Sequence, residues 1–238
     1  MWTALLDVLY PPYCAACDAS LQDGDPAPLC ATCAEASLEP VPQHACSTCG
    51  EVRLGALLHR VCARCFASPP RFSCARAAYL YGGALRDAIT KMKFGGREDL
   101  CGPLAACLAR EALTHVDALG DFAVVAPVPL HPERLAERGF DQATPLARAV
   151  ARALHRRFAR PLRRVRATVP QSRLDAEARV ANLRNAFVVV ERVRGIGVLL
   201  VDDVLTTGAT ADACAAVLLD AGAARVVVLT LARASTVD

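Results

Sequence analysis

The chain has 238 residues, of which 54% are hydrophobic and 21% are charged, and its formal net charge at pH 7 is +3. This composition supports a packed core and excludes a disordered chain. The length allows one domain of about 150 residues and a smaller one. A net charge this small does not by itself indicate a nucleic-acid-binding protein.

Residues 1–10 are apolar, but they carry no basic stretch and no small-residue cleavage site of the kind found in signal peptides. Asp7 interrupts this run, which is too short to span a bilayer. We expect a short amphipathic helix that packs against the next module, with membrane contact as the alternative. No other stretch reaches transmembrane length, so we expect no membrane span and a cytoplasmic protein.

Eight of the twelve cysteines form four Cys-x-x-Cys pairs within the first 65 residues. In a reducing compartment this pattern indicates metal binding rather than disulfides. Two such pairs supply four thiolates, the tetrahedral ligand set that Zn²⁺ prefers. The spacing C-x2-C-x12-C-x2-C occurs twice, 32 residues apart, so we expect two tandem zinc ribbons with two Zn²⁺ ions, bound by Cys14, Cys17, Cys30, Cys33, Cys46, Cys49, Cys62 and Cys65.

The spacing leaves the pairing of these cysteines open. Consecutive pairing joins the first pair with the second and the third with the fourth, whereas an interleaved cross-brace joins the first with the third and the second with the fourth. Redox chemistry is a further alternative, but it does not need four pairs. We expect His44 and His59 to be bystanders, and the four remaining cysteines to be small buried hydrophobic residues, namely Cys74, Cys101, Cys107 and Cys214.

Ser68-Pro69-Pro70-Arg71 has the composition of a linker and divides the chain into domains at 1–68 and 71–238. In the second domain, apolar runs typical of strands alternate with helical segments, which predicts an α/β fold with a doubly wound, mostly parallel sheet. The expected strands are 75–81, 122–126, 186–190, 196–201 and 226–231. After a turn at Gly82-Gly83, the expected helices run from 84 to about 92, from about 100 to 115, from 143 to 158, and from 211 to 221.

Residues 198–210, VLLVDDVLTTGAT, are the most informative segment. A buried strand ends in Asp202 and Asp203, and a Thr/Gly turn follows at the start of a helix. Backbone N–H groups, hydroxyls and the helix dipole together make an anion site, and paired carboxylates can accept hydrogen bonds from vicinal sugar hydroxyls. The segment therefore predicts a cradle for a 5′-phosphate and a clamp for a ribose. An ordinary strand–turn–helix with solvated acids is the alternative.

This segment resembles the motif with which type I phosphoribosyltransferases bind 5-phosphoribosyl 1-pyrophosphate (PRPP). The resemblance implies that Asp202 and Asp203 hold the ribose hydroxyls and that Mg²⁺ accompanies PRPP. It also implies a phosphate site made by Thr206, Thr207, Gly208, Ala209 and Thr210. Purine-salvage members often have an aspartate where this chain has Thr206, so the resemblance favours other acceptors, and we assign no catalytic residue.

A proline-rich loop follows the strand at 122–126. Pro127, Val128 and Pro129 stiffen the backbone, and Arg134 and Arg138 come soon after. Guanidinium groups suit phosphate oxygens, and in type I phosphoribosyltransferases the loop in this place holds pyrophosphate. A solvated helix face is the alternative for the two arginines. Farther along, the polar residues from Arg164 onward, with Thr168 and Gln171, predict a mobile loop that covers PRPP, or else a plain surface loop.

Two further segments are strongly basic. A helix exit carries Lys91, Lys93 and Arg97 next to Gly95 and Gly96, which suits either helix capping or contact with a polyanion. From residue 148 to residue 166 there are eight arginines and no acid, and those at 148, 152 and 156 have i,i+4 spacing. Such a stripe suggests a polyanion such as nucleic acid, although aromatic residues for base stacking are few.

Taken together, the chain resembles the ComF family of competence-associated proteins. The resemblance rests on the paired Cys-x-x-Cys module, on Pro127–His131 with Arg138–Gln142, and on Arg166-x-Thr168-x-x-Gln171. It implies a double zinc ribbon followed by a type I phosphoribosyltransferase-like domain, with a role in natural competence, in handling incoming single-stranded DNA, and with competence proteins as partners. The alternatives are a non-catalytic sensor of PRPP or a nucleotide, and an adaptor that binds DNA through the ribbons and the arginine stripe.

Overall fold

The structure is a computed structural model that describes residues 12–26, 28–52, 60–166 and 185–234. The expected helix at 1–10, His59, and the loop residues Thr168 and Gln171 lie outside these ranges.

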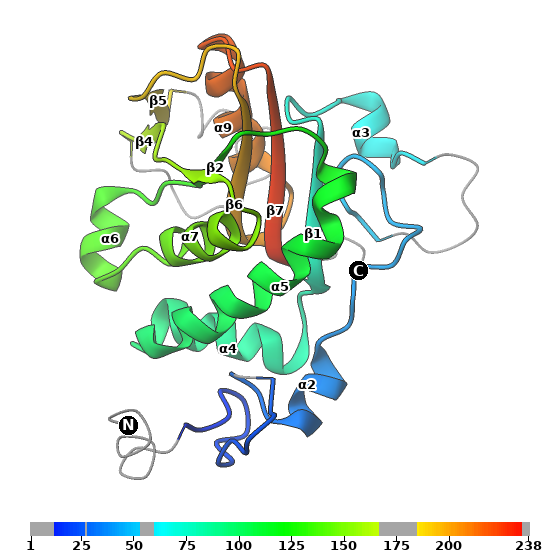
Figure 1. The fold of residues 1–238 in the computed structure, drawn as a ribbon, viewed down its shortest axis with the longest axis vertical. Helices are drawn as coiled ribbons and strands as arrows, with labels where there is room; N and C mark the ends of the chain where they lie inside the picture. Colours follow the sequence, from blue (N-terminus) through cyan, green and yellow to red (C-terminus); the bar gives the residue numbers. More distant parts are fainter. Residues whose placement is uncertain (1–11, 27, 53–59, 167–184, 235–238) are drawn as a thin grey trace.

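A five-stranded parallel sheet forms the centre of the molecule, with the strand order β1-β7-β6-β2-β3 (Figure 1). The predicted doubly wound parallel sheet is therefore confirmed. A separate two-stranded antiparallel sheet pairs β4 with β5. The strands are β1 (Cys74–Leu80), β2 (Val124–Pro127), β3 (Arg157–Phe158), β4 (Leu162–Arg164), β5 (Phe187–Val189), β6 (Gly197–Leu205) and β7 (Arg225–Arg233).

Helices cover both faces of this sheet. Along β6, Leu199 and Val201 belong to one hydrophobic core, and Val198 and Leu200 belong to the other. This burial on both faces explains why the strand reads as a continuous apolar run. The first core contains residues of α4, α5 and α7, and the second contains residues of α9. The helices of this domain are α4 (Gly83–Phe94), α5 (Cys101–Leu119), α6 (Pro132–Arg138), α7 (Ala143–Ala153) and α9 (Ala209–Asp220), with a 3-10 turn at Glu98–Leu100.

The helix expected at 143–158 was predicted too long. α7 ends at Ala153, and His155 has a φ of +51°. The chain then turns to add β3 to the sheet beside β2, where Val124 pairs with Arg157. Pairing with the open side of β2 thus competes successfully with continued helix, and Arg156 is not part of a helical stripe.

The two cysteine-rich ribbons pack against different parts of the sheet domain. The first ribbon contains α2 (Ala31–Ser37), whose Ser37 Oγ accepts a hydrogen bond of 2.9 Å from the backbone N–H of Ala84 in α4. The second ribbon contains α3 (Ala63–Ala67). The segment from Glu39 in the connection to Thr48 in the second ribbon runs along β1, because the N–H of Ala75 donates to the Thr48 carbonyl and the N–H of Leu80 donates to the Glu39 carbonyl. Within the described ranges, none of the helices has the length and hydropathy needed to cross a membrane.

Candidate functional site

The eight paired cysteines form two separate clusters of four. Within each cluster the sulfur atoms all lie within 4.8 Å of one another, and the clusters are Cys14, Cys17, Cys30 and Cys33, and Cys46, Cys49, Cys62 and Cys65. Consecutive pairing is therefore correct, and the interleaved alternative is wrong. The Sγ–Sγ distances of 3.8 Å for Cys17–Cys30 and 3.7 Å for Cys49–Cys62 fit zinc, because four Zn–S bonds of about 2.3 Å in a tetrahedron place the sulfurs about 3.8 Å apart.

The two clusters differ in their surroundings. In the first cluster Cys17 is exposed, whereas all four cysteines of the second are buried. In the second cluster the backbone N–H of Cys62 donates to Cys46 Sγ over 3.2 Å. Burial alone would raise the pKa of the Cys46 thiol, but backbone N–H donors outweigh burial and lower this pKa below its ordinary value. Such donors favour the thiolate that binds a metal ion. The four cysteines outside the clusters are buried and free, as expected.

The Thr/Gly turn joins β6 to α9 as the sequence predicts. β6 extends through both acids to Leu205, and α9 begins at Ala209. Gly208 is the N-cap, with a φ of +83°, and the ring of Phe72 would lie 3.7 Å from a Cβ at this position. The turn needs glycine because a left-handed conformation is costly for other residues. The first amides of a twelve-residue helix therefore face a turn that carries two threonine hydroxyls.

The two acids of β6 differ in exposure, because Asp203 is buried and Asp202 is half-buried. Asp203 is 3% exposed, and its carboxylate lies 2.7 Å from Lys93 Nζ and accepts a hydrogen bond of 2.9 Å from Gln142 Nε2. Asp202 accepts a hydrogen bond of 2.9 Å from the backbone N–H of Asp203. Desolvation and, secondly, the negative charge of Asp203 raise the pKa of Asp202. A solvated pair of acids, the alternative left open by the sequence, does not describe Asp203.

A hydrogen-bond network links Asp203 to Arg138 through Gln142. Arg138, the last residue of α6, donates to Gln142 Oε1 over 2.6 Å, and Gln142 in turn donates to Asp203. Sequence reasoning selected Arg138 but not Gln142 as a site residue. The signal available was the position of this glutamine in the segment Arg138–Gln142, which comes directly after the proline-rich loop.

The basic exit of α4 serves two purposes. Lys91 pairs with Asp18 at 3.5 Å, and Arg97 pairs with Asp99 at 2.7 Å, so these two cations have structural partners. Lys93 instead reaches the acid of the predicted ribose clamp. Gly95 is the C-cap of α4, with Lys91 and Lys93 in its last turn, which agrees with the capping interpretation, and contact with a polyanion stays a prediction.

The proline-rich loop lies beside the acids. Pro127 pairs with Val201 in the sheet, and the backbone N–H of Val128 donates to the Val201 carbonyl over 2.9 Å. The loop carrying Pro127, Val128 and Pro129 therefore starts at the same end of the sheet as Asp202, which follows Val201 directly. Because the carboxyl ends of parallel strands meet at one side of a sheet, the loops after β2 and β6 can share a ligand.

A basic cavity of about 370 Å³ lies next to this end of the sheet, lined by Lys93, Phe94, Gly96, Arg134, Glu137 and Arg138. The Phe94 side chain is 74% exposed, and the Arg138 guanidinium lies 5.2 Å from the centroid of its ring. Burial lowers the pKa of Arg138 from its ordinary value, and the nearby Asp203 opposes this effect. Cations beside an exposed aromatic ring suit a phosphate next to a base.

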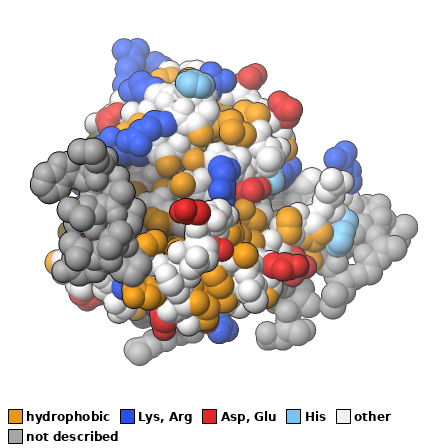
Figure 2. All heavy atoms as spheres, turned by 60° about the horizontal axis from the view of Figure 1, so that its bottom comes forward, with side chains coloured by type: hydrophobic (Ala, Val, Ile, Leu, Met, Phe, Trp, Pro, Cys, Tyr) orange, Lys and Arg blue, Asp and Glu red, His pale blue; other side chains and the backbone are white. Residues whose placement is uncertain are grey.

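The arginine-rich segment is largely engaged with the protein itself. Arg148 lies 4.3 Å from the ring centroid of Phe158, and Arg156 lies 5.8 Å from that of Phe122. Arg160 pairs with Asp141 at 3.6 Å. These contacts give several of the eight arginines an intramolecular partner that the sequence spacing did not indicate. On the face shown in Figure 2, lysine and arginine side chains gather toward the upper left, and the rest of the face is mixed.

Comparison with known proteins identifies a matching domain family and related proteins. A model of the double zinc ribbon domain matches residues 5–66. The DNA utilization protein YhgH of Escherichia coli K12 is 34% identical over 174 residues, which cover 71% of this chain and 76% of the relative. The competence protein ComFC of Bacillus subtilis is 30% identical over 149 residues, which cover 63% of this chain and 59% of the relative.

The chain belongs to the ComF family. A ComF protein is expected to carry a double zinc ribbon and a phosphoribosyltransferase-like domain, and the clusters and the parallel sheet of this chain agree with both. Among solved structures, glutamine PRPP amidotransferase from B. subtilis, complexed with ADP and GMP, is 21% identical, with a TM-score of 0.41 over 60% of this chain and 30% of that one.

Proposed function

We propose that this ComF protein binds PRPP together with Mg²⁺ at the β6–α9 turn and acts in the handling of single-stranded DNA. One observation carries the proposal. Two adjacent acids, the half-buried Asp202 and the buried Asp203 that Lys93 and Gln142 hold, lie shortly before a Thr/Gly turn that opens onto the N-terminus of α9. This arrangement suits a sugar that carries a 5′-phosphate, because hydroxyl groups can donate to the acids while the phosphate accepts from the amides.

In this proposal each end of PRPP has its own residues. The 5′-phosphate lies on the turn at Thr206–Thr210, and the ribose hydroxyls donate to Asp202 and Asp203. The pyrophosphate lies toward the loop at Pro127–Pro129, where Arg134 and Arg138 supply positive charge. Thr168 and Gln171 remain candidates to cover the ligand.

The carboxylates also suit Mg²⁺, a hard cation that prefers oxygen ligands. Asp202 is the residue we expect to hold the ion, directly or through water, together with oxygens of PRPP. When bound, the ion neutralises the charge of the pyrophosphate leaving group. The chain itself would bind and orient the ribose and stabilise negative charge.

The reaction that fits such a site is displacement of pyrophosphate at ribose C1 by a nucleophile. Thr206 offers no strong general acid or base, so the protein would contribute chiefly positioning. A ligand sensor needs the same binding contacts without turnover. Release of pyrophosphate therefore distinguishes a transferase from a sensor. We also propose a cytoplasmic location, where reduced thiols stay available for zinc, and two domains, a ribbon module at 1–68 and a PRPP domain at 71–238.

Two observations support contact with DNA. The cavity beside the acids combines Lys93, Arg134 and Arg138 with the exposed ring of Phe94. Relatives of the chain are named for DNA utilization and for competence. We propose that single-stranded DNA, with other competence proteins as partners, approaches this cavity.

Calorimetric titration with PRPP and MgCl₂ tests the binding proposal. The wild type should bind, and Asp202→Asn should bind at least tenfold more weakly because its neutral amide accepts hydrogen bonds less strongly and holds Mg²⁺ poorly. Asp220→Asn, at the exposed end of α9, is the matched control and should bind as the wild type does. Absence of binding by the wild type at millimolar PRPP would overturn the proposal. Release of labelled pyrophosphate with candidate acceptors then separates a transferase from a sensor.

A further inference from the structure

A buried ion pair joins the second ribbon to the last strand of the sheet. The side chain of Arg233, in β7, is 0% exposed and pairs with Glu51, whose side chain is 7% exposed. Glu51 follows the cluster residue Cys49 by two positions. Removing either partner of such a buried pair is strongly destabilising, because it leaves an uncompensated buried charge.

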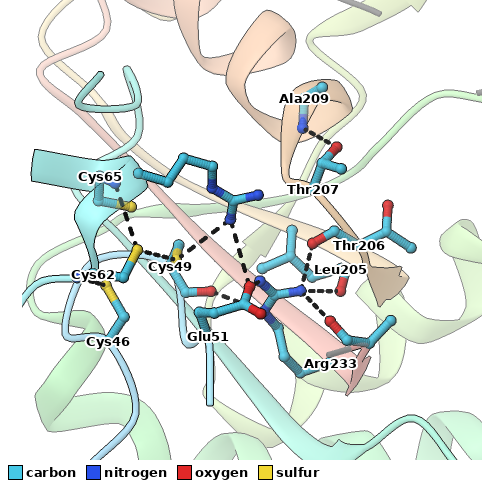
Figure 3. Close-up of polar contacts among 12 residues, drawn as sticks. Cys46, Cys49, Glu51, Cys62, Cys65, Leu205, Thr206, Thr207, Ala209 and Arg233 are labelled. Carbon is cyan, nitrogen blue, oxygen red and sulfur yellow. Dashed lines mark hydrogen bonds and ion pairs between the residues drawn. The ribbon is translucent and has the colours of Figure 1, made fainter. Parts of the chain in front are cut away.

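The same guanidinium also holds the backbone on either side of it. Arg233 Nε donates to the Cys49 carbonyl over 3.1 Å. Arg233 Nη1 donates to the Leu205 carbonyl over 2.8 Å and also to the carbonyl of Thr206. Figure 3 shows Arg233 between Glu51 and Cys49 on one side and the end of β6 on the other. One side chain thus connects a metal-cluster residue to the start of the phosphate turn.

These contacts constrain the direction of the turn's amides. In a trans peptide the C=O and the following N–H point in opposite directions. Fixing the carbonyls of Leu205 and Thr206 on Arg233 therefore directs the N–H groups of Thr206 and Thr207 away from Arg233. These amides belong to the turn that the proposed function assigns to the 5′-phosphate.

A second arginine strengthens the connection at the cluster. Arg64 Nη2 lies 3.7 Å from Cys49 Sγ and 3.6 Å from Glu51 Oε2. A cavity of about 280 Å³ is lined both by Cys49 and Cys65 of the second cluster and by Thr207 and Gly208 of the turn. The second cluster therefore adjoins the turn.

The first cluster has a different neighbour. Its ribbon contacts α4 through the hydrogen bond between Ser37 and Ala84 and through the ion pair between Asp18 and Lys91. These contacts lie on the helix and do not involve the β6–α9 turn. The two clusters are alike in sequence spacing but differ in what they support.

We propose that Arg233 is a positioning residue that couples metal occupancy of the second cluster to the phosphate-binding conformation of the β6–α9 turn. The ion holds the four sulfurs together and so fixes the Cys49 carbonyl and Glu51. Arg233 transmits this position to the Leu205 and Thr206 carbonyls. The first cluster does not have this role. The inference rests on the proposed function, because it takes PRPP as the ligand of the turn.

The repeat provides matched variants for the test. Cys46→Ser and Cys14→Ser change equivalent buried cysteines, at 1% and 0% exposure, and zinc content should fall in each. Titration with PRPP and MgCl₂ should show at least tenfold weaker binding for Cys46→Ser and a change of less than twofold for Cys14→Ser. Equal losses in the two variants, or none in either, would overturn the coupling.

Variants of Arg233 and its partner Glu51 should weaken PRPP binding without loss of metal. Glu51→Gln and Arg233→Lys should keep two zinc ions by elemental analysis, bind PRPP more weakly, and exchange the amide hydrogens of residues 206–208 faster. Glu35→Gln, at an exposed position of the first ribbon, is the control. Circular dichroism checks that each variant folds, and Glu51→Gln remains informative if Arg233→Lys does not. Unchanged amide exchange in a folded variant would overturn the inference.

The amide-exchange result separates two kinds of failure. If the wild type does not bind PRPP but the connection variants expose the turn amides, the proposed function fails and the structural coupling stands. If the wild type binds PRPP and the variants match it, the coupling fails and the proposed function stands.

Discussion

Lys93 Nζ lies 2.7 Å from Asp203 Oδ1, and the two side chains are 19% and 4% exposed. The lysine comes from the last turn of α4, and the aspartate comes from β6. A basic helix exit and an acidic strand end, which the sequence presents as separate features, are therefore one site.

Lys93→Met should lower the free energy of unfolding by about 3–5 kcal/mol at pH 7, because it leaves Asp203 buried without its cation. Urea denaturation measures the effect. Lys91→Met on the same helix is the control, since the exposed pair of Lys91 with Asp18 should contribute only about 0–1 kcal/mol. Equal losses in the two variants would show that the buried pair is not special.

The contribution of Asp202 to stability should fall as the pH rises from about 4 to about 7, the interval between the ordinary pKa of an aspartate and the raised pKa of Asp202. In this interval the unfolded chain has released the proton and the folded chain still holds it, so raising the pH favours unfolding. Asp202→Asn removes this contribution and should be more stable than the wild type at pH 8, by about 1 kcal/mol or more. Urea midpoints at pH 4.5 and pH 8 test this, and Asp220→Asn should follow the wild type.

The purified chain should contain two zinc ions, as measured by elemental analysis, because each cluster holds its sulfurs at tetrahedral spacing. Cys62→Ser should reduce the content to about one. Cys74→Ser, which changes a buried cysteine outside the clusters, should leave two. A content of two ions after Cys62→Ser would contradict the assignment of this residue as a ligand.

Phe94→Ala should weaken binding of single-stranded oligonucleotides by about 1–3 kcal/mol if a base stacks on the exposed ring. Fluorescence anisotropy at several salt concentrations measures the effect. Phe66→Ala removes another exposed ring, 84% accessible and located in the second ribbon, and should change the affinity little. Arg134→Gln should reduce the dependence of affinity on salt concentration, because it removes one phosphate contact.

Much of the fold could be predicted from local sequence. Continuous apolar runs indicated buried strands such as β6, which is buried on both faces, and the spacing of the cysteines indicated two clusters. The end of α7 could not be predicted in this way. Nothing local marks Ala153 as a helix end, because the competing interaction is pairing of β3 with a strand more than 30 residues earlier.

The candidate site was only partly predictable for the same reason. The motif at 202–210 is recognisable from its paired acids and its Thr/Gly turn. Arg138 was found because it follows a stiff loop. The partners Lys93 and Gln142 reach Asp203 from segments 110 and 61 residues away in the sequence. No spacing rule connects such residues, and only the packing of α4 and α7 against the sheet brings them together. The contacts of Arg233 with Glu51 and Leu205 are long-range in the same sense.

The hydrogen bonds from Ala75 to Thr48 and from Leu80 to Glu39 have a consequence for engineering the chain. β1 is the terminal strand of the parallel sheet, and the inter-ribbon connection covers its outer backbone groups where a further strand would otherwise lie. A truncated protein starting at Arg71 would expose these groups as a template for strand addition by another molecule, which promotes aggregation. The ribbons thus also act as an edge guard, and poor solubility of such a truncation would be expected even if its ligand site were intact.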